Sequence, residues 1–190
     1  MATSCIVMAA GSASRFGGNK LAASFRGKPL LRWALEAVPA DRLGPVVVVT
    51  QYPEAKAMAA GFGFLTVGNA HPDWGVSYTI RLGLDAVGAC EAAMFLVADQ
   101  PLLRRETAAA LVDFSQAHPE RVVGLAHGGV RGNPCIFPAR FFPELRELRG
   151  DRGGGVIIRR HMAELLLLEA PARELADVDT LQALEALEQL

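Results

Sequence analysis

The sequence predicts an α/β fold with a mainly parallel sheet and helices on both of its faces. Two continuous apolar runs, Val46–Val49 and Met94–Val97, indicate strands that are buried on both sides. Strand-like and helix-like segments alternate along nearly the whole chain, which is typical of this fold class. Because 190 residues suit one domain, a single domain over residues 1–190 is expected.

Each element is expected where an apolar pattern of the right period occurs. Proline at position 29 fits a first helical turn, and Asp179 is a natural cap for a last helix with a Leu181, Leu184, Leu187 stripe. The glycine-rich stretch Ala126–Pro134 is the expected break in the alternation. Strands are predicted at Ser4–Ala10, Val46–Thr50, Phe64–Val67, Ala93–Ala98, Val122–Ala126, Pro134–Phe137 and Leu165–Glu169. Helices are predicted at about Pro29–Val38, Glu54–Ala60, Ser77–Val87, Arg104–Ala117, Arg152–His161 and Thr180–Leu190.

Composition excludes several function classes. The net charge is −1, so no broad basic surface for nucleic acid is expected. The three cysteines lie far apart without Cys-x-x-Cys spacing, which predicts neither disulfides nor a structural zinc. No apolar window is long enough to span a membrane, and the short apolar start ends in a glycine loop. A cytoplasmic protein is therefore expected.

The loop after the first predicted strand is a candidate phosphate cradle. It runs from Gly11 to Lys20 and carries small side chains together with Arg15. Small residues let backbone N–H groups approach a ligand, and the two cations attract anionic oxygens. The loop is neither a P-loop, which needs a Ser or Thr after the lysine, nor a Gly-x-Gly-x-x-Gly fingerprint. The alternative is a plain glycine- and serine-rich turn with a solvated Lys20.

Two carboxylates are candidate metal ligands. Asp99 follows an apolar strand, so it should lie at the carboxyl edge of the sheet, where open α/β sheets bind ligands. Beside bound phosphates it could hold Mg²⁺; otherwise it caps the turn before Pro101. Asp179 is a second metal candidate, with helix capping as its alternative role.

Three further turns carry polar groups. Gly75 and Ser77 stand at a predicted helix start, where N–H groups and a hydroxyl could bind a nucleotide, although Ser77 could equally be a plain N-cap. Asn133 and Asp151 lie in small-residue turns, and Asp151 could simply cap the next helix. The histidines show no pairing pattern, and no Gly-x-Ser-x-Gly elbow supports a serine hydrolase.

With these residues in view, the chain resembles the MobA-like nucleotidyltransferases, most closely the molybdenum cofactor cytidylyltransferase branch. The resemblance covers almost the whole chain. Five segments match in order: Met8–Gly17 with Lys20, Gly75–Arg81 with Gly83 and Leu84, Ala98–Pro101, Gly132–Phe137, and Gly150–Gly153 followed by Asp177–Thr180.

This resemblance implies a three-layer, Rossmann-like nucleotidyltransferase fold with a mixed sheet. It also implies transfer of CMP from CTP to the phosphate of molybdopterin, with release of pyrophosphate. Mg²⁺ is the implied cofactor, with Mn²⁺ as the alternative that oxygen ligands accept. A molybdoenzyme or its chaperone is the implied recipient, and neither nucleic acid nor a membrane is an expected partner.

The implied roles fall on motif positions of this chain. Lys20, Arg15 and Asp99 are the expected catalytic residues, and Asp99 and Asp179 the expected metal ligands. Asn133 and Asp151 are expected to bind the acceptor. The expected nucleotide-binding residues are Ala9, Ala10, Gly11, Ser12, Arg15, Lys20, Gly75, Ser77 and Arg81.

Alternatives concern the nucleotide and, above all, the acceptor. The Ala9-Ala10 pair resembles the CTP-using branch, whereas GTP-using members tend to have Gly-Gly there. The chain departs from the family pattern at Ser77–Thr79, at Asn133 and at Gly154-Gly155, all near where an acceptor should bind. A transferase with a sugar phosphate acceptor, and a carrier that binds without catalysis, are the other hypotheses.

Overall fold

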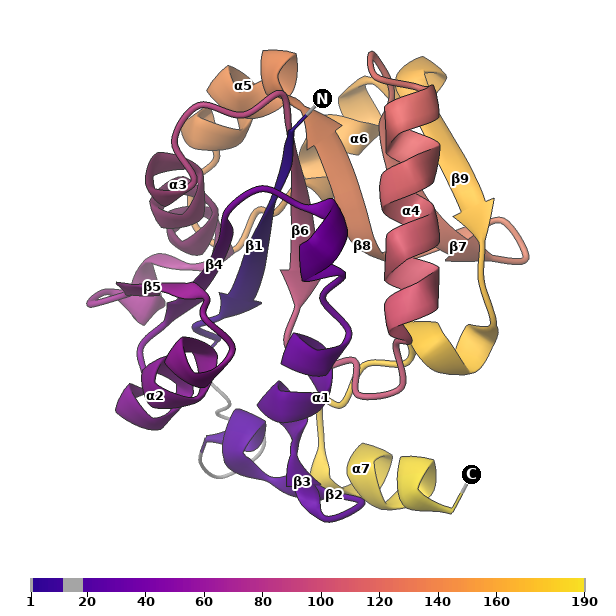
Figure 1. Ribbon diagram of the computed structural model, residues 1–190. Coiled ribbons are helices and arrows are strands. Elements are labelled where there is room, and N and C mark those ends of the chain that lie inside the picture. The colour runs from indigo at the N-terminus through magenta and orange to yellow at the C-terminus, as the bar shows by residue number, and fades with distance from the viewer. Residues whose placement is uncertain (1, 12–18, 190) are drawn as a thin grey trace.

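The computed structural model describes residues 2–11 and 19–189. In this part of the chain, seven strands form one sheet in the order β5-β4-β1-β6-β8-β7-β9 (Figure 1). The neighbours β5-β4, β4-β1, β1-β6 and β7-β9 are parallel, whereas β8 is antiparallel to both β6 and β7. The bounds are β1 (Thr3–Ala9), β4 (Val46–Thr50), β5 (Leu65–Gly68), β6 (Ala92–Val97), β7 (Val122–His127), β8 (Val130–Pro138) and β9 (Leu165–Glu169).

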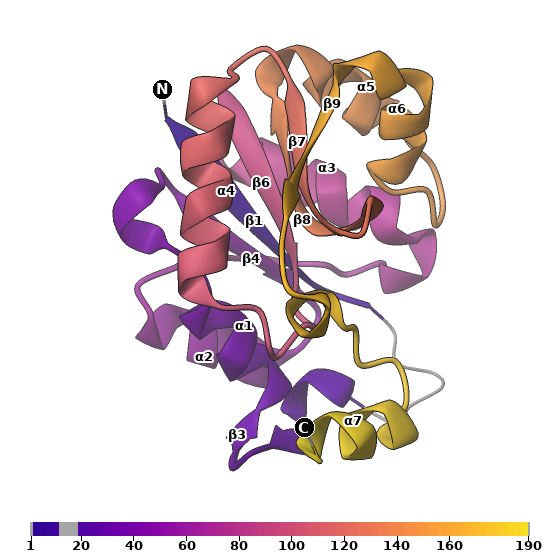
Figure 2. The ribbon, with the colours of Figure 1, turned by 90° about the vertical axis from the view of Figure 1, so that its right-hand side faces the viewer.

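Helices cover both faces of this sheet, which gives three layers (Figure 2). One face carries α1 (Leu30–Glu36), α2 (Pro53–Gly61) and α4 (Arg105–Ala117). The other carries α3 (Val76–Ala86), α5 (Phe142–Glu147) and α6 (Gly155–Arg160). The predicted α/β class with a mixed, mostly parallel sheet is confirmed. No helix in the described ranges is long and apolar enough to cross a membrane.

The apolar runs behave as predicted. In β4, Val46 and Val48 pack with one helical layer, while Val47 and Val49 pack with the other. Cys5 and Cys135 are buried in β1 and β8, where they serve as small apolar side chains. Burial raises the pKa of both thiols; Arg131 opposes that rise at Cys135.

A small third hydrophobic cluster joins the last helix to a hairpin from the first part of the chain. It forms where α7 (Leu181–Glu188) packs on a short hairpin of β2 (Ser24–Phe25) and β3 (Lys28–Pro29), below the sheet in Figure 1. Leu184 and Leu187 are buried there as expected, but Leu181 is 55% exposed, so the predicted stripe is shorter by one turn. This hairpin was not predicted, because two-residue strands leave no periodic pattern in the sequence.

The predicted caps at Asp179 and Asp151 are wrong, and one helix was not predicted. Thr180, rather than Asp179, caps α7, because the Thr180 hydroxyl accepts from the N–H of Ala183 at 3.1 Å. Helix α6 begins at Gly155, after Gly154 in the capping position, so Asp151 is not its cap. Helix α5 is only six residues long and has Pro143 in its first turn, which hides its period.

The expected break at Ala126–Pro134 is the hairpin between β7 and β8. Because β8 runs opposite to β6, Cys135 pairs with Phe95 and Pro138 pairs with Ala92. The beginning of β8 therefore lies at the same edge of the sheet as the ends of β1 and β6. This reversal brings Asn133 to the edge where ligands are expected.

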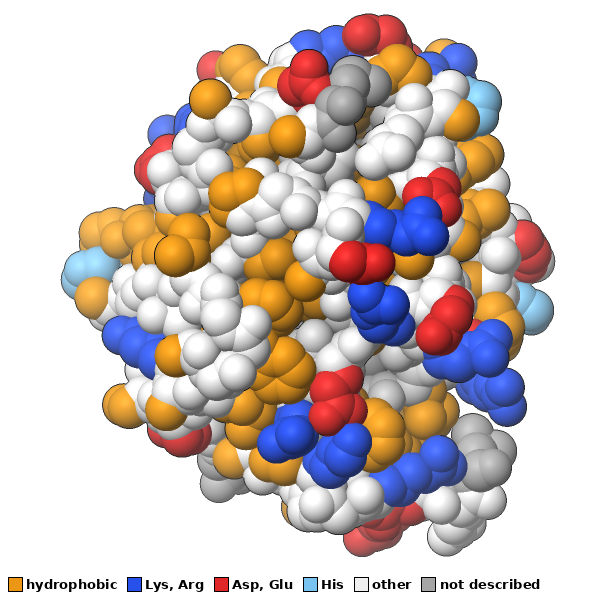
Figure 3. Space-filling view, in the orientation of Figure 1, with side chains coloured by type: hydrophobic (Ala, Val, Ile, Leu, Met, Phe, Trp, Pro, Cys, Tyr) orange, Lys and Arg blue, Asp and Glu red, His pale blue; other side chains and the backbone are white. Residues whose placement is uncertain are grey.

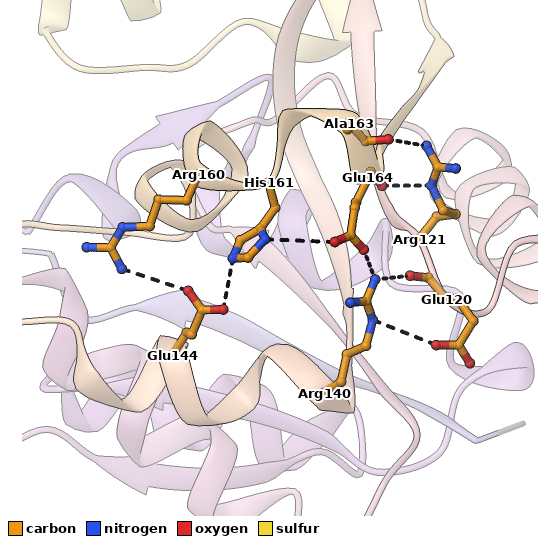
Figure 4. A network of polar contacts seen from close by, with 8 residues as sticks. All are labelled: Glu120, Arg121, Arg140, Glu144, Arg160, His161, Ala163 and Glu164. Atoms are coloured by element: carbon orange, nitrogen blue, oxygen red, sulfur yellow. Dashed lines mark hydrogen bonds and ion pairs between the residues drawn. The ribbon is translucent and has the colours of Figure 1, made fainter.

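An ionic network supports the neighbouring turn at residues 148–155 (Figure 4). His161, just after α6, contacts Glu144 of α5 at 2.9 Å, and Arg140 pairs with Glu164. Arg121 donates to the carbonyl oxygens of Glu164 and Ala163. The full network comprises Glu120, Arg121, Arg140, Glu144, Arg160, His161, Ala163 and Glu164. It ties α5 and α6 to the start of β7, and so fixes both ends of the glycine-rich turn.

Glu174 anchors the beginning of α4. Its side chain is fully buried and accepts from the backbone N–H and Nε of Arg104, at 3.2 and 2.8 Å. Burial alone would raise the pKa of Glu174, but hydrogen bonds from Thr107 and Arg104 lower it overall.

We expect Glu174→Ala to lower the free energy of unfolding by about 1–3 kcal/mol, because the backbone N–H and the Nε of Arg104 lose their acceptor. A lowered folded-state pKa means that the contribution of Glu174 is present above the unfolded-state value of 4.5 and is lost as pH falls below it. Urea unfolding at neutral and acidic pH measures both effects. An equal loss at every pH would contradict the charged role of Glu174.

Candidate active site

A cleft of about 370 Å³ opens at the carboxyl ends of β1 and β6. The ends of the two strands and the segment before α3 form its walls, as expected for an open α/β sheet. Its lining residues are Met8, Ala9, Ala10, Gly11, Lys20, Leu21, Pro72, Gly75, Val76, Thr79, Val97, Ala98, Asp99 and Asp151. Residues predicted from four separate motifs thus surround one cleft.

Lys20 and Asp99 meet in this cleft. The Lys20 Nζ lies 2.7 Å from Asp99 Oδ2, 3.2 Å from Asp179 Oδ1 and 3.0 Å from the carbonyl oxygen of Val178. An ammonium group has three protons, so these acceptors engage all of them. Desolvation favours the neutral amine, but Asp99 and Asp179 outweigh it and raise the pKa of Lys20. Lys20 is therefore a charged counter-ion shared by two carboxylates.

Asp177 adds a third negative charge nearby. Desolvation and then the charge of Asp99 raise the pKa of Asp177, against a hydrogen bond from Gln100 that lowers it. Among the described residues that line the cleft, Lys20 is the one cation that pairs with this acidic group. Asp177 was expected only as part of a motif, and its proximity to Asp99 was not predicted.

We expect Asp177→Asn to stabilise the ligand-free protein at neutral pH. A raised folded-state pKa means that ionised Asp177 disfavours the folded state at pH values above its unfolded value of 3.8. The gain in melting temperature should therefore disappear as pH falls toward that value. Thermal melting across pH measures it, with Asp73→Asn, at an exposed carboxylate of the 3-10 turn Pro72–Trp74, as the matched control. A destabilised Asp177→Asn protein at neutral pH would contradict the prediction.

Gly75 brings two turns of the cleft into direct contact. Its φ of 84° and ψ of 178° belong to a region open essentially to glycine alone. A Cβ at this position would lie 2.3 Å from the carbonyl carbon of Gly150. The N–H of Ser77 donates to the carbonyl oxygen of Gly150 at 3.1 Å, so the start of α3 is joined to the turn that carries Asp151.

Ser77 is not the N-cap of α3. Gly75 occupies the capping position of α3, without a side-chain hydrogen bond, so the simple N-cap interpretation of Ser77 is wrong. Its buried hydroxyl has no hydrogen-bond partner within the described structure. Ser77 does not line the cleft, whereas Thr79 does and accepts from Asn69 Nδ2 at 3.1 Å.

A second pocket of about 200 Å³ adjoins the first and shares Met8, Val76 and Val97 with it. It is mainly apolar and contains Asn133 and Arg131 as polar residues. Its remaining lining residues are Ile80, Phe95, Cys135, Phe137, Leu145, Gly153, Gly154, Gly155 and Ile158. Arg131 has no carboxylate partner in the part of the chain that the structure describes; its Nη1 lies 3.3 Å from Cys135 Sγ.

The remaining predicted residues lie elsewhere. Arg81 stands on α3 with its guanidinium 5.4 Å from the ring centre of Tyr78, and it does not line either pocket. Ser12 and Arg15 lie outside the described residues.

Two supporting residues were missed by the sequence analysis. Gln51 donates to the carbonyl oxygen of Ala10 at 3.0 Å, and the Tyr52 hydroxyl donates to that of Gly11 at 3.2 Å. Both directly follow β4, so their position at the carboxyl edge of a parallel strand was the available signal. They hold the backbone at the beginning of the cradle loop.

The donor set fits a divalent ion that also binds substrate. Asp99 and Asp179 lie on either side of one ammonium group, so a cation already occupies the space between them. The described ranges contain no group of three or more acidic, histidine or cysteine side chains able to hold a metal alone. Mg²⁺ commonly binds one or two carboxylates and completes its shell with phosphates and water, which agrees with this arrangement.

Comparison with known proteins defines the family. The profile described as "MobA-like NTP transferase domain" matches residues 5–165. The chain belongs to this family. It is a nucleotidyltransferase of the MobA-like type. The ends of β1 and β6, Lys20 and Asp99 fall within the matched region, whereas Asp177 and Asp179 follow it.

Individual relatives are distant from this MobA-like protein. The purine catabolism protein PucB of Bacillus subtilis is 28% identical over 189 residues, covering 92% of this chain and 90% of PucB. The structure is similar to a nucleotidyl transferase from Methanothermobacter thermautotrophicus (TM-score 0.83, 19% identity, 99% and 96% coverage). It is also similar to Rv0371c of Mycobacterium tuberculosis in complex with manganese (TM-score 0.76, 22% identity, 100% and 99% coverage). These structures support the fold.

Proposed function

We propose that this MobA-like protein transfers CMP from CTP to the phosphate of a molybdopterin-type acceptor, releasing pyrophosphate. The observation that carries the proposal is the pair of adjoining pockets. One is polar and contains Lys20 and Asp99; the other is mainly apolar and contains Arg131 and Asn133. A polar pocket suits a triphosphate, and an apolar pocket with two polar groups suits a flat ring system.

The nucleotide is assigned to the first pocket. Ala9, Ala10 and Gly11 line it with minimal side chains, so a ligand can approach their backbone closely. The choice of CTP over GTP rests on the resemblance of Ala9-Ala10 to the CTP-using branch. Asp99 and Asp179 would hold Mg²⁺ or Mn²⁺, which when bound neutralises charge on the triphosphate. The manganese complex of Rv0371c supports a divalent ion.

The acceptor is assigned to the second pocket, with Asp151 at the junction with the first. Two glycines keep this pocket open: a Cβ at Gly154 would lie 2.8 Å from Phe137 Cζ, and one at Gly155 would lie 3.2 Å from Arg131 Nη2. These glycines replace the Ala-Arg that is commoner in the family. The departure therefore enlarges the space beside Arg131.

In the proposed reaction, an acceptor phosphate oxygen attacks the α-phosphorus of CTP. A new P–O bond forms as the bond to the bridging oxygen breaks, and that oxygen leaves with pyrophosphate. The acceptor is already anionic, so no strong base is needed, and positioning and charge neutralisation carry the catalysis. Lys20 must release at least one of its three present acceptors to donate to a phosphate oxygen.

Pyrophosphate release across the four nucleoside triphosphates, with and without molybdopterin, tests the proposal. CTP with molybdopterin should be the productive pair, and Asp99→Asn should abolish turnover while the control Asp73→Asn retains it. Preference for GTP or for a sugar phosphate acceptor would overturn the assigned specificity. Tight binding without pyrophosphate release, unaffected by Asp99→Asn, would indicate a carrier instead.

A further inference from the structure

A third pocket lies on the other side of the loop that follows Asp99. It encloses about 300 Å³ and is lined by Arg26, Trp33, Pro101, Leu102, Leu103, Arg104 and Arg173. None of these residues lines the nucleotide cleft or the apolar pocket beside it. Figure 3 shows Lys and Arg side chains over the lower part of this face, with acidic side chains and hydrophobic surface among them, where β2, β3 and α1 lie in Figure 1.

Three arginines reach this pocket from separate parts of the chain. Arg26 lies in the β2–β3 turn, with a positive φ of 47°, Arg104 precedes α4, and Arg173 lies in the 3-10 turn Ala172–Leu175. Within the described residues, Arg104 is the one of the three that forms an ion pair, with the buried Glu174, while Arg26 Nη2 donates to the carbonyl oxygen of Leu187 at 3.5 Å. Arg173 forms no ion pair with any residue that the structure describes, and no carboxylate is among the lining residues. The pocket therefore carries an excess of positive charge.

Hydrogen bonds position Arg104 and Trp33 in the wall of this pocket. Glu174 binds the Nε of Arg104, and among the described residues no acceptor contacts the two terminal nitrogens of that guanidinium. Trp33 is fixed by its Nε1 donating to the carbonyl oxygen of Phe25 at 2.8 Å, and Lys28 Nζ lies 4.5 Å from its ring centre. An aromatic wall beside guanidinium groups is a recurrent way to bind planar or apolar anions.

We propose that this pocket is a second anion-binding site, which takes a small molecule that carries phosphate or carboxylate groups on an apolar or aromatic body. Its volume of about 300 Å³ is at the lower end of the range for small-molecule pockets. Guanidinium groups that converge on a hollow match such a ligand better than a flat protein surface. The site is independent of the nucleotide cleft, because the segment Asp99–Leu103 separates the two.

Tryptophan fluorescence tests the site directly, because the chain has two tryptophans and only Trp33 lines this pocket. In a Trp74→Phe background, Trp33 is the sole reporter. Titration at low salt with EDTA uses pyrophosphate, AMP and citrate, which distinguish phosphate from carboxylate ligands. At least one probe should give a saturable change. Arg173→Gln should weaken that binding about tenfold or more, as expected for a lost charged hydrogen bond, and so should Arg104→Gln.

Arg159→Gln is the matched control, because Arg159 is an exposed arginine of α6, far from β2 and α1 in Figure 1. It should leave the affinity unchanged. Arg173→Gln keeps the test valid even where Arg104→Gln unfolds the protein through Glu174. The proposal is overturned by the absence of a saturable change with all three probes, or by equal affinity in Arg173→Gln and the parent. Binding of an Asp- and Glu-rich peptide without any small anion would overturn it in favour of a protein partner.

Discussion

Replacing Lys20 with methionine should lower kcat/KM for nucleotidyl transfer about 100- to 1000-fold, the usual effect of deleting one preorganised donor. Methionine keeps the length of the side chain but removes the charge that Asp99 and Asp179 now share. Charge that builds on the transferred phosphate would lose the compensation of the Lys20 ammonium group. Steady-state pyrophosphate release at saturating and limiting CTP measures the loss.

The matched control is Lys56→Met on α2, because Lys56 lines neither the cleft nor the apolar pocket beside it. It should retain full turnover. A melting curve separates catalysis from folding, since Lys20→Met also leaves Asp99 without its partner. Near-normal kcat/KM in a folded Lys20→Met protein would remove Lys20 from the mechanism.

Gly75→Ala should destabilise the protein by about 4 kcal/mol, from backbone strain plus displacement of a packed neighbour. The added Cβ would lie 2.3 Å from the Gly150 carbonyl carbon and 2.7 Å from the Asp151 nitrogen. The two turns would have to separate, which breaks the hydrogen bond between Ser77 and Gly150. Differential scanning calorimetry should show a melting temperature lower by roughly 8–16 °C.

Gly88→Ala isolates the steric part of this effect. Gly88 also has a positive φ, of 67°, but a Cβ there meets no atom within 4 Å. Its cost should be limited to about 1–2 kcal/mol of left-handed backbone strain. Equal melting temperatures for the two variants would show that the contact between the turns contributes nothing to stability.

Long periodic segments made the fold predictable. The valine run of β4 and the alternation of strands and helices predicted a mainly parallel sheet with helices on both of its faces, as observed. Short elements were not predictable: the β2–β3 hairpin has two residues in each strand, and α5 has a proline in its first turn. Their positions depend on long-range packing, such as α7 on Phe25 and Leu30.

The site was predictable where residues directly follow parallel strands. Asp99 and the start of the cradle loop were expected at one edge because β1 and β6 both end there, and Lys20 was expected to accompany them. The hydrogen bonds from Lys20 to the Val178 carbonyl oxygen and to Asp179 were not predicted. The segment that carries these acceptors follows a 3-10 turn and has no periodic pattern. Arg81 was expected from its motif alone, and the structure turns it toward Tyr78.

The reversed direction of β8 has an evolutionary consequence. A parallel strand would present its end at the catalytic edge, but β8 presents its beginning, next to the β7–β8 hairpin. Hairpin loops tolerate insertions and substitutions far better than buried strands. Changes in that hairpin can therefore reshape the wall around Asn133 without altering the segments that we propose hold the triphosphate. One scaffold can in this way acquire new acceptors while it keeps its nucleotide chemistry.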